Sequence, residues 1–169
     1  MDKGVALTGI PSQEELAASS GFPSAARLEK GPVAVIECVQ EIPCNPCEAA
    51  CSAGAISVGQ PITNLPRLDE EKCTGCGQCL APCPGLAIFR VHKHYSEEGA
   101  LVEFPYEYLP LPEKGQIVDC GNRAGEFVTK GKVVRTRRGK KGDLTSIVSV
   151  LVPKEHCMEA RTLCRKEMA

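Results

Sequence analysis

The sequence predicts an α+β fold, in which a duplicated, cysteine-rich segment is followed by a small antiparallel β module and a C-terminal helix. Three observations lead to this prediction. A group of cysteines recurs at a fixed offset, which indicates an internal duplication. From Gly99 onward, apolar and polar residues alternate in short runs between turn-forming residues, which is typical of strands. The last segment starts with Pro153 and two charged residues, as helices commonly do.

The duplication has an offset of 32 residues. At that offset Cys44, Cys47 and Cys51 superpose on Cys76, Cys79 and Cys83, and Ala55-Ile56 superposes on Ala87-Ile88. The second copy, "CTGCGQCLAPCPG", is complete: Cys73, Cys76 and Cys79 lie at intervals of three, and Cys83 and Pro84 follow. Thiolates at this spacing, on a loop with two glycines, can hold three corners of one iron-sulfur cluster, while the fourth cysteine points elsewhere.

Residues 32–98 resemble the bacterial-type ferredoxins that carry two [4Fe-4S] clusters. The resemblance implies a ferredoxin-like duplicated two-cluster domain, with short strands at "VAVIE", "AISV", "RLDE" and "AIFRV". It also implies that each half completes the cluster of the other half. One cluster, cluster 2, would be held by Cys73, Cys76, Cys79 and Cys51. The other, cluster 1, would be held by Cys44, Cys47, Cys83 and a fourth ligand.

The fourth ligand of cluster 1 departs from the pattern, because Glu41 stands at the position equivalent to Cys73. Either Cys38 reaches the cluster across a spacing of five residues, or Glu41 supplies an oxygen, or the cluster has three irons and an open corner. We favour Cys38, because a thiolate is the softer and commoner iron-sulfur ligand and a longer loop closes at modest entropic cost. A single zinc ion on four of these cysteines is the alternative metal, but it would leave the other cysteines of the repeat without a use.

Composition limits the partners and the compartment. The 20 basic and 21 acidic residues nearly cancel, so no overall field favours nucleic acid or a membrane surface. No apolar run approaches the roughly 20 residues that span a bilayer, and the first residues lack the pattern of a secretory signal. Eleven cysteines in such a chain therefore indicate metal ligation in a reducing, cytoplasmic compartment.

Outside the cysteine repeat we expect three further parts. Residues 1–31 form an N-terminal docking arm, with a short helix begun by a capping box of Ser12 and Glu15. Residues 99–153 form the β module, with "GNRAGE" and "RRGKKGD" as hairpin connections, and residues 154–169 form the helix. Cys120, Cys157 and Cys164 are expected to be packed apolar side chains rather than ligands.

No nucleotide-binding or phosphate-binding motif is visible in the sequence, nor is any arrangement of nucleophile, base and acid. We therefore expect no catalytic residues here, and an electron-transfer subunit rather than an enzyme on its own.

Roughly 100 residues lie outside 32–98, which favours a subunit docked on a larger oxidoreductase over a free shuttle. "GPVAVIECVQEIPCNPCEAAC" and "LDEEKCTGCGQCLAPCPGLAI" resemble the small iron-sulfur subunits of FAD-dependent amine or amino-acid dehydrogenases of the proline, hydroxyproline or sarcosine type. That resemblance implies a flavoprotein partner in a hetero-oligomer. A free two-cluster ferredoxin is the alternative, and an open iron corner would indicate a catalytic subunit.

Overall fold

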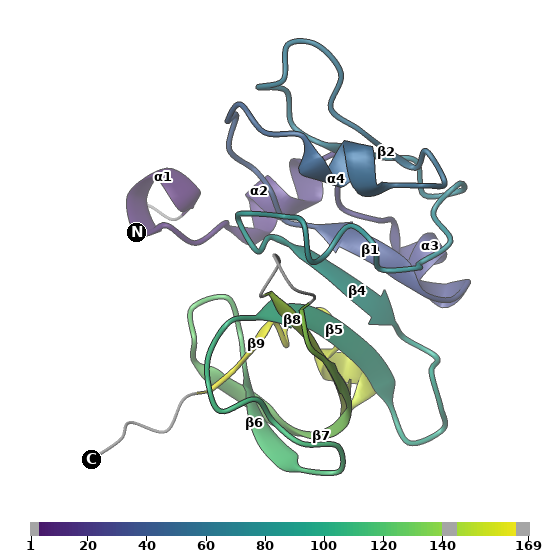
Figure 1. Ribbon diagram of the computed structural model, residues 1–169, viewed down its shortest axis with the longest axis vertical. Helices are drawn as coiled ribbons and strands as arrows, with labels where there is room; N and C mark the ends of the chain where they lie inside the picture. The colour runs from purple at the N-terminus through teal and green to yellow at the C-terminus, as the bar shows by residue number, and fades with distance from the viewer. Residues whose placement is uncertain (1–3, 140–144, 165–169) are drawn as a thin grey trace.

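The computed structural model describes residues 4–139 and 145–164, and within them two antiparallel sheets dominate the fold (Figure 1). The larger sheet has seven strands in the order β1-β4-β5-β8-β7-β6-β9. In chain order these are β1 (Val33–Ile36), β4 (Ile88–His92), β5 (Ala100–Tyr106), β6 (Ile117–Gly121), β7 (Phe127–Arg137), β8 (Ser146–Val152) and β9 (Thr162–Leu163). The smaller sheet pairs β2 (Ile56–Ser57) with β3 (Arg67–Leu68).

Strands β1 and β4 form a wall with apolar side chains on both faces. Ala34 and Ile36 face the cysteine-rich loops, whereas Val33 and Val35 face the core of the β module. Because successive side chains of a strand point to opposite faces, a strand buried on both sides reads as a continuous apolar run, as "VAVI" does. The wall therefore separates the cysteines from the module core while belonging to the same sheet as the module.

Strands β5 to β9 curve around a common core in the lower half of Figure 1. That core contains the fully buried Phe104 of β5 and valines from β1, β4, β5, β6, β7 and β8. The runs after Gly99 that were expected to form strands do overlap β5 to β8, and "GNRAGE" connects β6 to β7. The connection "RRGKKGD" joins β7 to β8, but residues 140–144 lie outside the described part of the chain. The boundary expected between residues 98 and 99 falls between β4 and β5, which pair with each other.

The N-terminal segment contains α1 (Val5–Thr8), α2 (Gln13–Ala18) and α3 (Ala25–Glu29). The expected capping box is present: the Glu15 N–H donates to Ser12 Oγ at 3.1 Å, and the Ser12 N–H donates to the Glu15 carboxylate at 2.7 Å. Leu16 and Leu28 are buried, and Leu28 belongs to the core of the β module. Helices α2 and α3 are therefore packed on the rest of the chain.

The helix expected over residues 154–169 is wrong for the part that the structure describes. A short 3₁₀-helix, η1 (Lys154–His156), is followed by β9, which pairs with β6. The Arg161 N–H donates to the Gly121 carbonyl at 2.9 Å, so this segment completes the edge of the sheet instead of bonding within a helix. Tertiary pairing thus outweighs the local helix signal. Residues 165–169 lie outside the described part of the chain.

The helices of residues 4–139 and 145–164 are all too short to cross a lipid bilayer.

Candidate metal centres

Cavity 2 is a small, mainly apolar cavity beside the second cysteine loop. It is lined by the three cysteines at intervals of three in the complete motif and by one cysteine of the first copy, namely Cys73, Cys76, Cys79 and Cys51. Ala34 and Ile56 close it from the strand side, and Arg90 lines it from β4. The structure thus brings together the four residues that the resemblance assigns to cluster 2.

Cavity 1 lies beside the first cysteine loop and also has four cysteines in its lining, Cys38, Cys44, Cys47 and Cys83. Ile36, Val58 and Ile88 supply its apolar walls. Glu41 does not line the cavity and its side chain is exposed. The structure therefore places Cys38, not Glu41, beside the other three cysteines of the cluster 1 set.

Local structure explains how each copy sends one cysteine to the other cavity. Helix α4 (Pro46–Ala50) carries Cys47 in cavity 1 and ends at Cys51 in cavity 2. Pro46 occupies the first turn, where its missing N–H costs nothing. In the second copy, the turn after Cys79 places Cys83 at cavity 1. Cys38 closely follows β1, so the end of a buried strand brings this cysteine to cavity 1.

Burial changes the acidity of the cavity thiols. It raises the pKa of Cys79 to about 12, with a further contribution from the neighbouring Cys73, Cys76 and Cys51. In cavity 1, burial and the neighbours Cys83 and Cys44 raise the pKa of Cys47 to about 11. Burial likewise raises the pKa of Cys38. Without a cation these thiols stay protonated at neutral pH, so metal binding must displace protons.

The cysteines of the two cavities can be compared with the ligands of a single zinc ion and with those of an iron-sulfur cluster. Among residues 4–139 and 145–164, no three His, Cys, Asp or Glu side chains meet closely enough to hold a single ion. Thiols that surround a cavity without meeting at one point suit a cluster, in which each iron takes one cysteine, better than a tetrahedral zinc ion. The Ala55 N–H also donates to Cys51 Sγ at 3.2 Å, which is the kind of N–H···S bond that iron-sulfur sites use. The donor set of both cavities therefore fits [4Fe-4S] clusters.

A buried ionic network adjoins cavity 2. The Arg90 guanidinium donates through Nε to the Gly75 carbonyl of the cysteine loop and forms an ion pair with Glu103 of β5. Glu103 also accepts from Ser149 Oγ at 2.7 Å and from Arg135 at 3.2 Å. These hydrogen bonds and charges keep the pKa of Glu103 below its usual value although burial acts to raise it. A positive charge is therefore held at the lining of cavity 2.

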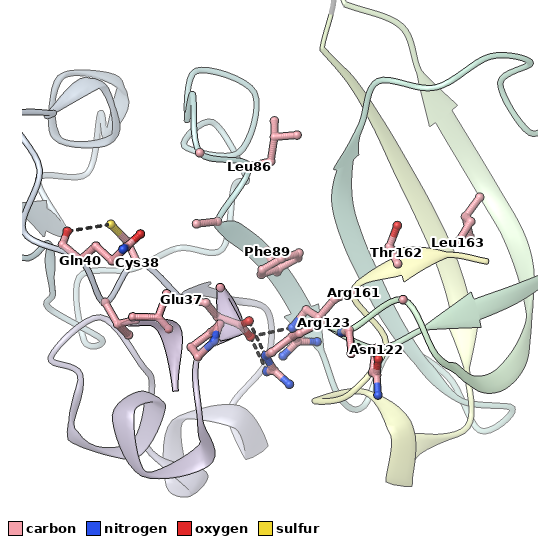
Figure 2. Close-up of a pocket in the computed structure, with 18 of the residues that line it drawn as sticks. Glu37, Cys38, Gln40, Leu86, Phe89, Asn122, Arg123, Arg161, Thr162 and Leu163 are labelled. Atoms are coloured by element: carbon pink, nitrogen blue, oxygen red, sulfur yellow. Dashed lines mark hydrogen bonds and ion pairs between the residues drawn. The ribbon is translucent and has the colours of Figure 1, made fainter. Parts of the chain in front are cut away.

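A larger groove of about 700 Å³ adjoins cavity 1 and lies between the cysteine-rich part and the β6–β7 hairpin (Figure 2). Cys38 and Gln40 line both the groove and cavity 1, whereas no lining residue is shared with cavity 2. Glu37, Arg123 and Arg161 meet at the groove, as Figure 2 shows by the dashed lines from the Glu37 carboxylate.

The three cysteines after residue 98, Cys120, Cys157 and Cys164, line neither cavity. Cys120 and Cys157 are buried in the core of the β module, as expected of packed apolar side chains, and Cys164 is half-buried. Sequence reasoning missed the charged residues next to the cavities, Glu37, Arg90, Glu103, Arg123 and Arg161. Charged residues scattered along strands and loops resemble ordinary solvent-facing positions, so their burial becomes visible only once the sheet brings them together.

Comparison with known proteins agrees with this geometry. Residues 66–89 match the family model of the 4Fe-4S binding domain. One component of the ion-translocating oxidoreductase complex of Methanosarcina acetivorans is 51% identical over 47 residues, which is 28% of this chain and 17% of that protein. The ferredoxin-type protein NapF of Escherichia coli K12 is 33% identical over 57 residues, covering 32% of this chain and 35% of its own length. A polyferredoxin-like subunit of the aliphatic sulfonate oxidoreductase of Pyrococcus furiosus is 46% identical over 48 residues, 28% of this chain and 27% of that subunit.

The chain thus spans only about a third or less of the length of these relatives. No solved structure matches it significantly. The family model itself covers residues 66–89, within the cysteine-rich part. On the matched motif and the surrounding thiols, the chain contains a 4Fe-4S binding domain at residues 66–89.

Proposed function

We propose that this chain is a subunit that relays electrons through two [4Fe-4S] clusters within a larger oxidoreductase complex. The observation that carries the proposal is the pair of neighbouring cavities, each lined by four cysteines and each receiving one of them from the other copy of the repeat. A single-cluster protein has no use for the second set of four. When bound, a [4Fe-4S] cluster supplies reversible electron transfer at a potential set by its surroundings.

Cluster 1 would be held by Cys38, Cys44, Cys47 and Cys83, and cluster 2 by Cys51, Cys73, Cys76 and Cys79. The walls of β1 and β4 exclude water from the inner side of both cavities, because Ala34, Ile36 and Ile88 pack against them. The raised pKa of Cys47 and Cys79 means that the apo chain keeps these thiols protonated until iron displaces the protons.

A relay needs one edge at which electrons enter and another at which they leave. Cys38 borders the groove beside cavity 1, and Cys76 of cavity 2 is exposed at the surface. Each proposed cluster therefore has a cysteine near a surface that a partner can approach. The two edges belong to different cavities, as expected for a chain that lies between a donor and an acceptor.

We further propose that the partner is a flavoprotein dehydrogenase subunit and that the complex is cytoplasmic. The resemblance to the small iron-sulfur subunits of FAD-dependent amine or amino-acid dehydrogenases supports the first point, and the use of cysteine for metal rather than disulfides supports the second. Relatives described as subunits of oxidoreductase complexes are consistent with a multisubunit assembly. The competing function is that of a free ferredoxin that shuttles electrons between enzymes.

Three substitutions test the ligand set. Cys38→Ser should convert cluster 1 to a three-iron form or abolish it, whereas Glu41→Gln and Cys120→Ser should leave both clusters intact. Iron analysis and EPR of the anaerobic, reduced protein separate these outcomes. Retention of both clusters in Cys38→Ser, with loss of iron in Glu41→Gln, would make the carboxylate the ligand and reopen a catalytic role for an exchangeable iron corner.

Size-exclusion chromatography of the protein from its native source separates the subunit from the shuttle. We expect this chain to co-elute with a flavin-containing polypeptide, seen by flavin fluorescence in the same fraction. Elution of the brown protein as a monomer near its 18.1 kDa mass would support the free ferredoxin instead.

A further inference from the structure

Two buried carboxylates, Glu37 and Glu103, each form ion pairs with two arginines. The Glu37 network lies at the groove beside cavity 1, and the Glu103 network reaches the lining of cavity 2 through Arg90. Glu37 is 7% exposed and Glu103 is 3% exposed. A carboxylate this deeply buried is stable only when it is paired and hydrogen-bonded. Neither group is required by a cysteine motif, so their function has to be sought in what their partners hold in place.

Glu37 connects the end of β1 to the β module. Its carboxylate accepts from Arg161 Nε at 2.7 Å and from two nitrogens of Arg123 (Figure 2). Its backbone N–H donates to the Ala87 carbonyl at 2.8 Å. The next residue is Cys38. Both the side chain and the backbone of Glu37 are therefore fixed immediately before the cysteine with the unusual spacing.

The two arginines of this network are themselves anchored in the β module. Arg161 donates through Nη1 to the carbonyls of Cys157 and Ala160, and its guanidinium lies over the Phe89 ring at 4.9 Å. Arg123 donates to the Met158 carbonyl at 3.1 Å. A guanidinium with several fixed bonds holds a carboxylate in one orientation, which a single lysine charge would not do.

Glu103 makes the corresponding connection to cavity 2. It lies on β5, and Arg90 donates both to its carboxylate and to the Gly75 carbonyl in the cysteine loop. Gly75 and Arg90 both line cavity 2. The module thus contacts the segment before Cys38 through Glu37 and the Gly75 loop through Glu103 and Arg90, and the two networks share no residue.

We propose that Glu37 and Glu103 are positioning residues for different clusters, Glu37 placing Cys38 at cavity 1 and Glu103 placing the Gly75 loop at cavity 2 through Arg90. This gives the β module a function in building the metal centres. It also accounts for the long spacing after Cys38, because a cysteine held from outside its loop does not need the loop to place it. The inference rests on the two-cluster function proposed above.

The test is a reciprocal pair of variants, Glu37→Gln and Glu103→Gln, which remove a charge with little change of shape. In Glu37→Gln we expect the EPR signal of cluster 1 to shift or to convert to a three-iron signal, with iron falling from about eight toward about seven per chain. The signal of cluster 2 should be unchanged. In Glu103→Gln we expect the EPR signal of cluster 2 to change and the signal of cluster 1 to stay the same. Cys38→Ser and Cys76→Ser assign each signal to its cluster.

Thermal stability serves as the readout for a merely structural role, because each substitution removes a buried carboxylate that pairs with two arginines and should lower the unfolding midpoint of the holoprotein. Equal disturbance of both clusters by each variant, or no change in either signal, would overturn the inference. If Glu37→Gln does not fold, Arg123→Lys is the milder probe, since it keeps the charge and leaves the Arg161 pair with Glu37. It should then perturb cluster 1 alone.

The wild-type chain separates failure of this inference from failure of the function on which it rests. If the wild type holds only about four irons, the two-cluster proposal fails. If it holds about eight and the two variants are not selective, only the positioning roles of Glu37 and Glu103 fail.

Discussion

Gly75 is the position in the cysteine loop where a single methyl group should be most damaging. Its φ is +64°, and a Cβ there would lie 2.3 Å from the Pro32 carbonyl oxygen. Gly54 has nearly the same backbone angle, φ +61°, but a Cβ there would meet no heavy atom within 4 Å. Gly75→Ala and Gly54→Ala therefore add the same methyl group at the same kind of backbone position, and differ in the space available for it.

The magnitudes follow from this geometry. In Gly54→Ala only the left-handed backbone is strained, at a cost of about 1–2 kcal/mol. In Gly75→Ala the methyl group is also about 1.1 Å too close, measured against an ordinary contact of 3.4 Å. The Pro32 carbonyl cannot easily move, because it accepts from Arg27 Nη2 at 2.9 Å, and Arg27 also holds the Cys73 carbonyl. Overpacking of this kind adds about 1–3 kcal/mol, so the total for Gly75→Ala is about 2–5 kcal/mol.

Anaerobic thermal unfolding of the holoproteins, followed by the visible absorption of the iron-sulfur chromophore, measures the difference. At about 2–4 °C per kcal/mol, the midpoint should fall by about 2–8 °C in Gly54→Ala and by about 4–20 °C in Gly75→Ala. EPR should show that Gly75→Ala disturbs cluster 2 first, because Gly75 lines cavity 2. Equal midpoints for the two variants, or an undisturbed cluster 2 signal in Gly75→Ala, would refute the reasoning.

Three further predictions concern the potentials and the remaining cysteines. Pro46 has no N–H to donate to a cluster sulfur, so Pro46→Gln should raise the potential of cluster 1 in an EPR-monitored titration; an unchanged value would mean that charge and burial set this potential instead. In the native holoprotein, iodoacetamide should modify Cys164 but neither Cys120 nor Cys157, because Cys164 is partly exposed and the other two are buried, and peptide mass spectrometry will show any labelling that contradicts this. Burial raises the pKa of the Cys120 thiol to about 12, above the roughly 8.5 of an exposed thiol, so its contribution to stability is present below about pH 8.5 and is lost as the pH rises toward 12. Cys120→Ala should therefore flatten the alkaline loss of stability in denaturant titrations at several pH values, and an unchanged slope would contradict that origin.

Much of the fold could be predicted from local patterns. The strand-like runs after Gly99 mark the places of β5 to β8, and the capping box of Ser12 and Glu15 marks a helix start with its own side chains. The terminal helix was predicted on equally local grounds and is wrong over residues 154–164. There, Thr162 and Leu163 complete the edge of the sheet against β6, a long-range pairing that no local pattern encodes.

The cysteine sets are what the resemblance to two-cluster ferredoxins implies, and the spacing of the repeat carries that resemblance. The structure adds why Cys38 is available: the buried strand β1 ends beside cavity 1. The charged residues around the cavities were not predictable, since Glu37 and Arg161 are 124 positions apart and meet only through the folded sheet. Burial of a charge is a property of the assembled fold, whereas cysteine spacing is a property of the chain.

The content of iron and acid-labile sulfide in the anaerobically purified chain tests the central claim most directly. Two cavities with four cysteines each should bind two [4Fe-4S] clusters, and hence about eight irons and about eight sulfides per chain in a brown protein. About four of each would restrict the site to a single cluster. Stoichiometric zinc without sulfide would contradict the account of both cavities.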